Sequence, residues 1–385
     1  MAEPMRIAMV AGEASGDMLG SRLIDALRRR LPRAVFCGIG GPRMIAAGFD
    51  SWFAQERLAV RGFVEVVRHL PELLRIRRTL ARRLRAERPR LFIGIDSPEF
   101  NLGLERRLKR SGVVTAHLVS PQVWAWRPGR VRTMGRSVSL MLVLFPFEEE
   151  IYRARGVPVA FVGHPLADEI PEHVDRETMR EELRLPARVP VIAILPGSRD
   201  SEIEMMAEPF IEAAKLILRR VPQARFLVPL VTRETRERFE AAVYRRDAHE
   251  LPMSLLFGHA QDALKACDVA LATSGTVTLE AALTHRPMVI AYRVAPLSWA
   301  IGRRLVRVPY IGLPNILCGE AVVPEFIQDD ATPENLAQAV TNLLADEPVR
   351  RAVERRFERL HSEMRRDAAE RAAEALLPLV GAPTV

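Results

Sequence analysis

Short apolar stretches alternate with longer amphipathic ones along the first half of the chain. The apolar stretches predict β-strands at Ile7–Val10, Val35–Gly38, Leu91–Ile95, Val113–Leu118 and Leu140–Phe145, with Val159–Leu166 as the last strand of this half. The stretches between them repeat apolar residues at helical spacing and predict helices at Met18–Leu31, Val64–Glu87, Pro98–Arg110 and Glu148–Arg155. Continuous apolar strands separated by helices are typical of a parallel sheet that is buried on both faces.

A polar stretch, residues 168–190, separates this half from a second series of the same kind. Strands are predicted at Val191–Leu195, Arg225–Val231, Ser254–Phe257, Val269–Ala272 and Met288–Tyr292. Residues Pro348–Leu377 predict one or two long amphipathic helices. We therefore expect an α/β fold of two Rossmann-like, doubly wound domains facing a ligand cleft. The expected domains are 1–167 and 168–345, with C-terminal helices over 346–385 that pack back.

Composition narrows the possible partners. The chain has 385 residues and a net charge of +8, and much of the excess arginine lies in predicted helices such as 75–90. These helices are either solvated faces or surfaces attracted to an anionic membrane or a phosphorylated substrate. Nucleic acid is not expected, because the basic runs contain few aromatic residues to stack on bases. The three cysteines and eight histidines form no CxxC or HExxH pattern, so neither a metal nor a cofactor is predicted.

The stretch DVALATSGTVTLEAAL, residues 268–283, has an apolar strand, a tight turn and a helix. Ser274, Gly275 and Thr276 form the turn, and free amides at the helix start favour an anion such as a diphosphate. Glu280 follows on the helix, where its carboxylate can accept hydrogen bonds from sugar hydroxyls. A second turn of this kind, at 196–199, places Arg199 where its guanidinium can bind phosphate. The alternative for Arg199 is a surface ion pair with Glu202.

Carboxylates follow two strands of the first half. The turn GEASGD at 12–17 lacks the GxGxxG pattern, and its two acids would repel a pyrophosphate, so NAD is not expected there. This turn suits a sugar acceptor, or it is an ordinary helix start capped by Ser15 or Asp17. Asp96 ends another strand, where it is either a general base or the N-cap of the next helix.

The predicted helix from Phe63 to Leu74 has one apolar face, which is followed by a dense run of arginines. Such a face either packs in the core or enters the headgroup layer of a membrane, and we favour the membrane. No apolar run is long enough to span a bilayer.

Motifs in the same order over nearly the whole chain resemble the lipid-A-disaccharide synthase family of inverting GT-B glycosyltransferases. They are GEASGD (12–17), GIDSPEFN (94–101), SPQVWAWRPGR (120–130), FPFE (145–148), VGHPL (162–166), LPGSR (195–199), SGTVTLEAAL (274–283), GLPNIL (312–317) and VPEFIQ (323–328). The resemblance implies the reaction of UDP-2,3-diacylglucosamine with 2,3-diacylglucosamine 1-phosphate, which gives the β(1→6) disaccharide 1-phosphate and UDP.

The resemblance also implies roles for individual residues. Asp96 matches the proposed general base, and Glu13 is the other carboxylate that could take the proton. Ser15 matches a polar position of the N-terminal site, and Arg199, Glu280 and Asn315 match positions that hold the diphosphate and the ribose or uracil. The family's membrane-contacting helix corresponds to Val64, Val66, Val67, Leu70, Leu73 and Leu74. A homodimer with exchanged C-terminal segments, located at the cytoplasmic face of the inner membrane, is also implied.

Two other functions remain open from the sequence. One is a different GT-B enzyme acting on a UDP-sugar, either an epimerase or another transferase. The other is a non-enzymatic protein that binds membranes peripherally through an α/β scaffold.

Overall fold

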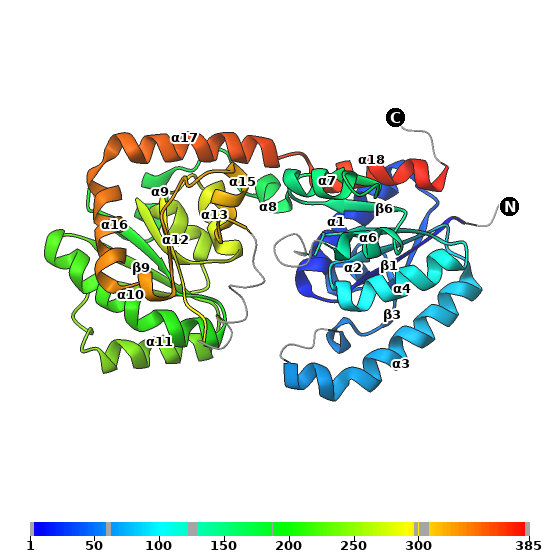
Figure 1. Cartoon of the computed structure of the whole chain (residues 1–385), viewed down its shortest axis with the longest axis horizontal. Coiled ribbons are helices and arrows are strands. Elements are labelled where there is room, and N and C mark those ends of the chain that lie inside the picture. The colour runs from blue at the N-terminus through cyan, green and yellow to red at the C-terminus, as the bar shows by residue number, and fades with distance from the viewer. Residues whose placement is uncertain are drawn as a thin grey trace. The chain divides into compact units, whose positions relative to one another are not determined.

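The computed structural model describes residues 4–58, 63–121, 129–186, 188–295, 299 and 308–381, and it describes only the backbone of residues 63–68. The chain forms two compact units (Figure 1). The N-terminal unit comprises Met1–Asp168 together with Met364–Val385, and the C-terminal unit comprises Glu169–Glu363. None of the described helices is both long and apolar enough to cross a membrane.

The N-terminal unit is built on a parallel sheet of seven strands in the order β3-β2-β1-β4-β5-β6-β7. The strands are β1 (Arg6–Ala11), β2 (Val35–Ile39), β3 (Asp50–Phe53), β4 (Leu91–Ile95), β5 (Val114–Leu118), β6 (Leu140–Val143) and β7 (Val159–Phe161). Side chains alternate between the two faces of a strand, and an apolar run such as β1 therefore serves two cores. Met9 packs into the core on one face of the sheet, and Val10 packs into the core on the other.

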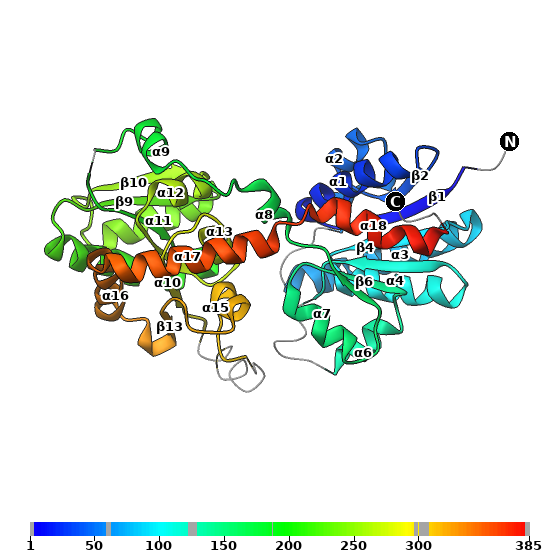
Figure 2. The same cartoon turned by 90° about the horizontal axis from the view of Figure 1, so that it is seen from above.

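Helices cover both faces of this sheet. Helix α1 (Ala14–Arg30) and the C-terminal helix α18 (Ala368–Val380) pack on one face, and α3 (Phe63–Glu87) and α4 (Pro98–Arg110) cover the other (Figure 2). The shorter helices are α2 (Pro42–Ala46), η1 (Gln55–Arg57), α6 (Arg130–Gly135), α7 (Pro146–Arg153) and α8 (Pro165–Glu169).

The C-terminal unit has a parallel sheet of six strands in the order β10-β9-β8-β11-β12-β13. The strands are β8 (Val191–Leu195), β9 (Arg225–Leu230), β10 (Met253–Phe257), β11 (Val269–Thr273), β12 (Met288–Tyr292) and β13 (Glu325–Ile327). Its helices are α9 (Arg176–Glu182), α10 (Asp200–Arg220), α11 (Arg233–Arg245), α12 (Ala260–Ala266), α13 (Thr276–Leu283), α15 (Leu313–Cys318), η2 (Gln328–Asp330), α16 (Pro333–Ala345) and α17 (Glu347–Met364). Thr332 caps α16, because its side chain accepts from the amide of Asn335, and Pro333 occupies the first turn.

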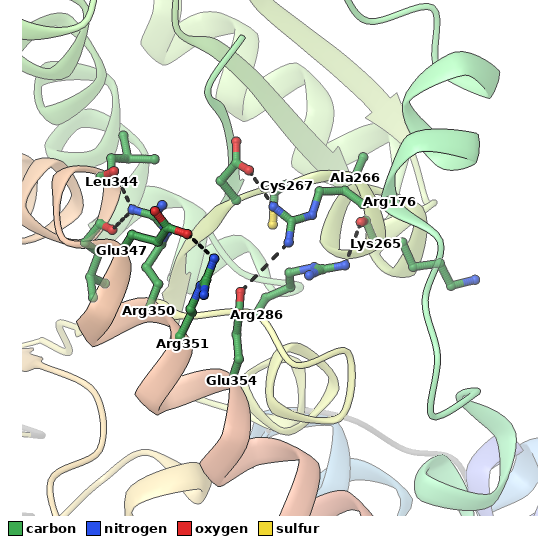
Figure 3. Close-up of polar contacts among 12 residues, drawn as sticks. Arg176, Lys265, Ala266, Cys267, Arg286, Leu344, Glu347, Arg350, Arg351 and Glu354 are labelled. Atoms are coloured by element: carbon green, nitrogen blue, oxygen red, sulfur yellow. Dashed lines mark hydrogen bonds and ion pairs between the residues drawn. The ribbon is translucent and has the colours of Figure 1, made fainter. Parts of the chain in front are cut away.

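The C-terminal helices expected over 346–385 are divided between the units. Helix α17 belongs to the C-terminal unit, where Arg176 pairs with Glu354 at 3.9 Å and Arg350 donates to the carbonyl of Leu343 (Figure 3 shows this region). Helix α18 belongs to the N-terminal unit, where Glu370 forms an ion pair with Arg30 of α1. The apolar face of α18 completes the core over α1, which explains why the chain returns to its first unit.

Several elements differ from the sequence-based expectation. Strands β3 and β13 were not predicted, because they are short and only partly buried, and therefore carry little apolar signal. Helix α1 begins at Ala14 instead of Met18. The strand expected over Val159–Leu166 ends at Phe161, since Pro165 starts helix α8.

Each sheet has one point where the strand order reverses. In the N-terminal unit β1 lies between β2 and β4, and in the C-terminal unit β8 lies between β9 and β11. In open α/β sheets, ligands bind outside the carboxyl ends of the strands at such a point. The turns that follow β1, β4, β8 and β11 are therefore the candidate functional sites.

Candidate active site residues

The turns after β1 and β4 touch each other at the carboxyl edge of the N-terminal sheet. A Cβ atom on Gly12 would lie 2.5 Å from Oγ and 3.2 Å from Cβ of Ser97, so a larger residue here would require Ser97 to shift. Gln55 donates from Nε2 to the carbonyl of Glu13 at 2.7 Å and fixes the first turn. Gln55 could not be recognised from the sequence, because its role depends on a contact between distant segments.

The polar residues of the turn at 12–17 have different surroundings. Glu13 occupies the N-cap position of α1 and is half-buried, and Ser15 is exposed in the first turn. Asp17 is 3% exposed, and its carboxylate accepts hydrogen bonds from the amides of Gly41, Arg43 and Met44 at 2.8, 2.9 and 3.0 Å. The alternative in which Ser15 or Asp17 caps α1 is wrong, because Glu13 occupies the N-cap position and Asp17 caps the neighbouring helix α2.

Asp96 lies directly after β4 in a left-handed backbone conformation, with φ 53°, and Ser97 follows with φ 45°. Ser97 occupies the N-cap position of α4, so Asp96 is not the cap of this helix. Asn101, buried on α4, donates to the carbonyl of Asp96 at 2.8 Å and holds this turn. Each non-glycine residue in the left-handed backbone region carries about 1–3 kcal/mol of conformational strain, and Asp96 and Ser97 are two in succession. Such strain is concentrated at functional sites.

The carboxyl group of Asp96 is half-buried, and its surroundings shift its acidity. Burial raises the pKa of Asp96, and the nearby Glu13 carboxylate raises it further. A backbone hydrogen bond from Ser97 and the charge of His117 act against this rise. The pKa of a carboxyl group raised in this way moves toward neutral pH, which suits a general base.

A buried ion pair lies between β5 and α4. His117 and Glu105 are both fully buried, and Nδ1 of His117 lies 2.6 Å from Oε1 of Glu105. Burial alone lowers the pKa of His117, but the adjoining Glu105 carboxylate outweighs it and raises the pKa. Neither Nε2 of His117 nor Oε2 of Glu105 has a hydrogen-bond partner among the described residues. This pair could not be recognised from the sequence, since its members lie in separate elements.

Arg199 is the N-cap residue of α10 in the turn after β8. Its side chain is 78% exposed and pairs with Glu202 at 3.2 Å, so the alternative ion pair is present. Glu202 also accepts from the amide of Ser198 at 2.9 Å, and Gly197 adopts φ 128° with no room for a side chain beside Glu202. Because an exposed ion pair contributes at most about 1 kcal/mol, this guanidinium can still turn to an anionic ligand.

The turn after β11 presents open backbone at the start of α13. Gly275 adopts φ 155°, and a Cβ atom placed on it would have nothing within 4 Å. Gly275 and Thr276 are exposed, and Oγ of Ser274 donates to the carbonyl of Ile311 at 3.2 Å. Glu280 is half-buried on α13, where burial raises its pKa and a hydrogen bond from Gln261 opposes the rise.

Asn315 lies at the same edge of this sheet but is fully buried. Its Nδ2 donates to the carbonyl of Val323 and to Glu325, both at 2.8 Å, and its Oδ1 accepts from two backbone amides. An amide nitrogen has two hydrogens, so both donors are used within the protein. Glu325 also accepts from the amides of Ile311 and Gly312. Asn315 and Glu325 thus hold the loop next to Ser274.

The apolar positions expected to contact a membrane are only partly described. Leu70 is 45% exposed on α3, and Leu73 and Leu74 are half-buried. The side chains of Val64, Val66 and Val67 lie outside the described residues, as does 122–128 of the tryptophan-containing motif. Further along α3, Ile76, Leu80 and Leu84 pack into the core, while arginines 75, 78, 82 and 85 are exposed along the other side.

The three cysteines are free thiols. Cys37 and Cys267 are buried, and burial raises the pKa of each to about 11, whereas Cys318 is half-buried. Within the described part of the chain, no group of three or more His, Cys, Asp or Glu side chains is arranged to hold a metal ion.

The fold is similar to that of several solved structures. It matches the Anabaena protein HepE in complex with UDP and glucose, with a TM-score of 0.58 and 14% identity over 97% of this chain and 99% of that chain. It also matches a glycosyltransferase from Rickettsia africae, with a TM-score of 0.62 and 10% identity over 99% of both chains. Together with the two parallel sheets, these likenesses define the fold as that of a GT-B glycosyltransferase.

Sequence similarity then gives the particular family. A family profile described as lipid-A-disaccharide synthetase matches residues 7–376. The lipid-A-disaccharide synthase of Chromobacterium violaceum is 54% identical over 97% of both chains, and that of Neisseria meningitidis is 49% identical over 97% of this chain and 98% of the relative. The chain belongs to the lipid-A-disaccharide synthetase family and is a glycosyltransferase of lipid A biosynthesis. The resemblance drawn from the sequence motifs is confirmed.

Proposed function

We propose that the chain transfers diacylglucosamine from UDP-2,3-diacylglucosamine to the 6-hydroxyl of 2,3-diacylglucosamine 1-phosphate, with inversion at the anomeric carbon and release of UDP. Family membership supports the substrates and the reaction. The observation that carries the mechanism is the placement of Asp96, a strained and half-buried carboxylate at the reversal point of the N-terminal sheet.

Asp96 acts as the general base in this proposal. Its carboxylate takes the proton from the acceptor hydroxyl as the oxygen attacks the anomeric carbon from the face opposite UDP. The transition state resembles an oxocarbenium ion, as in glycoside hydrolysis, and removing the proton increases the nucleophilicity of the oxygen. Glu13 is the second carboxylate at this edge, and with Ser15 it binds acceptor hydroxyls.

The turns of the C-terminal unit hold the donor. Arg199 and the free amides after Gly275 neutralise the diphosphate as it leaves, and Ser274 and Thr276 line this turn. Glu280 accepts hydrogen bonds from the hydroxyls of the donor. Asn315, whose donors are used within the protein, contributes by holding the loop beside Ser274.

The test is an assay that follows UDP release and disaccharide formation together. Both products are expected when both substrates are present, and neither when the acceptor is omitted. Asp96→Asn keeps the side-chain size and tolerates the left-handed backbone, and we expect it to lower kcat by about 10²–10⁴-fold with little change in donor binding. Asp25→Asn, at an exposed acid on α1 of the same unit, is the matched control. Near wild-type turnover by Asp96→Asn would refute the assignment of the base.

We also propose that α3 docks on the cytoplasmic face of the inner membrane. The exposed Leu70 and the exposed arginines on the same helix support this role. Each arginine near an anionic bilayer contributes about 1 kcal/mol, which depends on salt. We expect the chain to float with phosphatidylglycerol vesicles, and Arg78→Gln/Arg82→Gln to reduce this binding more than Arg238→Gln, on a helix of the other unit. Equal binding by both variants would refute the docking surface.

A homodimer with exchanged C-terminal segments is the last part of the proposal. The contact between α18 and α1, including the pairs of Arg30 with Glu370 and Glu374, could form equally between two chains. Light scattering during size exclusion should then give twice the mass of 43.2 kDa. A monomer at micromolar concentration would refute the dimer without affecting the proposed reaction.

A further inference from the structure

A polar layer lies under Asp96, on the sheet face that α4 covers. Gly94 and His117 are register partners on β4 and β5, so their side chains point to the same face. Asn101 and Glu105, one turn apart on α4, face this layer: Asn101 binds the carbonyl of Asp96, and Glu105 binds His117. A Cβ atom on Gly94 would lie 2.1 Å from Oε1 of Glu105. Glycine at this position therefore provides the space that the side chains of Glu105 and His117 occupy.

The stability of the fold does not require the pair of His117 and Glu105. Apolar side chains including Val10, Phe92, Leu104 and Leu108 form a core cluster between the sheet and these helices, and the uncharged polar side chains of Asn101 and Thr115 are also fully buried in this unit. Burying an ion pair costs several kcal/mol of desolvation, and apolar residues of similar volume are often equally or more stabilising. A charged pair at this one position therefore points to a role in the site above it.

The groups around Asp96 indicate how the pair of His117 and Glu105 affects its carboxylate. Glu13 from the turn before α1 and Glu99 from the first turn of α4 both disfavour a second negative charge, as does burial. The backbone hydrogen bond from Ser97 lowers the pKa of Asp96, and the charge of His117 on the neighbouring strand acts in the same direction. Burial lowers the pKa of His117, but the adjoining Glu105 carboxylate outweighs this effect and raises it, while burial raises the pKa of Glu105 itself.

We propose that His117 and Glu105 are positioning residues for Asp96: the imidazolium, held protonated and oriented by Glu105, keeps the Asp96 carboxylate ionised and able to accept a proton. This inference rests on the proposed role of Asp96 as the base. Asn101 completes the arrangement by fixing the backbone of Asp96 from the same helix.

The acid limb of the pH–rate profile tests this inference. Glu105→Gln preserves the shape and removes the charge, so His117 loses its proton and the pKa of Asp96 rises. The acid limb is the pH range in which kcat/KM falls as the base becomes protonated, and we expect it to move upward by about 1 pH unit. At pH values below this range kcat/KM should be about tenfold lower than in the wild type, and at pH values above it nearly unchanged. His117→Asn should move the limb in the same direction.

Thr115→Val is the matched control. Thr115 is a fully buried polar residue on the same strand, and its hydroxyl donates to the carbonyl of Ser137 at 2.9 Å. This variant should lose stability without moving the limb. If Glu105→Gln and His117→Asn also lose stability and leave the limb unmoved, as expected for Thr115→Val, the pair is only structural and the inference is refuted.

Two further measurements cover variants that do not fold and separate this inference from the proposed role of Asp96. If neither variant folds, ¹⁵N NMR of the wild-type histidines at pH 7 decides, because the inference requires a protonated His117 and a neutral ring would overturn it. Asp96→Asn separates this inference from the proposed function. Loss of activity in Asp96→Asn with an unmoved limb in Glu105→Gln refutes the positioning role alone, whereas an active Asp96→Asn refutes the role of the base itself.

Discussion

Replacing Asp17 should destabilise the N-terminal unit while leaving the chemistry nearly intact. Although Asp17 lies in the same short motif as Glu13, its carboxylate is buried and is directed at the start of α2. Asp17→Ala removes the acceptor of three backbone amides, those of Gly41, Arg43 and Met44. The hydrogen bonds from the amides of Gly41 and Met44 are buried, whereas that from Arg43 is partly buried.

The expected loss follows from these contacts. A lost N-cap costs about 0.5–2 kcal/mol, and each buried donor left without a partner costs about 1–3 kcal/mol unless the structure relaxes. Since α2 is short and can fray, we expect a total of about 3 kcal/mol for Asp17→Ala. For a unit of this size, that loss lowers the melting temperature by about 6–12 °C. Asp17→Asn keeps one acceptor oxygen and should lose about half as much.

Thermal unfolding and amide hydrogen exchange measure this effect. The amides of Arg43 and Met44 should exchange much faster in Asp17→Ala, and kcat below the unfolding transition should stay within a few-fold of wild type. Asp25→Ala, at an exposed acid on the same helix α1, is the control and should be neutral. A stability within about 0.5 kcal/mol of wild type, or a large loss of kcat in a fully folded variant, would show that Asp17 is not primarily a cap.

Three further predictions concern donor binding, backbone conformation and pH. Arg199→Ala should raise the KM of the UDP-sugar about 10–100-fold with almost no change in melting temperature, because the exposed pair with Glu202 contributes little; an unchanged KM would refute the phosphate contact. Gly275→Ala should lower stability by about 1–3 kcal/mol, measured by urea unfolding, because its φ of 155° disfavours a side chain although the space is open. Burial lowers the pKa of His164 to about 4, so its contribution to stability is complete above pH 6.5 and falls by about 3 kcal/mol as the pH drops to 4. His164→Asn should flatten this part of the pH–stability curve, and an unchanged slope would contradict the assignment.

The sequence alone determined the positions of most strands and helices, since apolar periodicity is a local property. Both sheets, the core strands Leu91–Ile95 and Val191–Leu195, and the glycine-containing turns that follow strands were predictable for this reason. The family was also determined by the sequence, because its motifs occur in order along nearly the whole chain. Short, partly buried strands such as Asp50–Phe53 gave too little apolar signal to be predicted.

Only the tertiary structure decided which polar side chains serve the fold and which are available for chemistry. Asp17 and Asp96 both follow apolar strands, yet Asp17 caps α2, whereas Asp96 is strained and half-buried beside Glu13. Asn315 could not be recognised as internally bonded, nor His117 as paired with Glu105. These roles depend on contacts between residues far apart in the chain, which arise only when the strand order brings separate turns to one edge of a sheet.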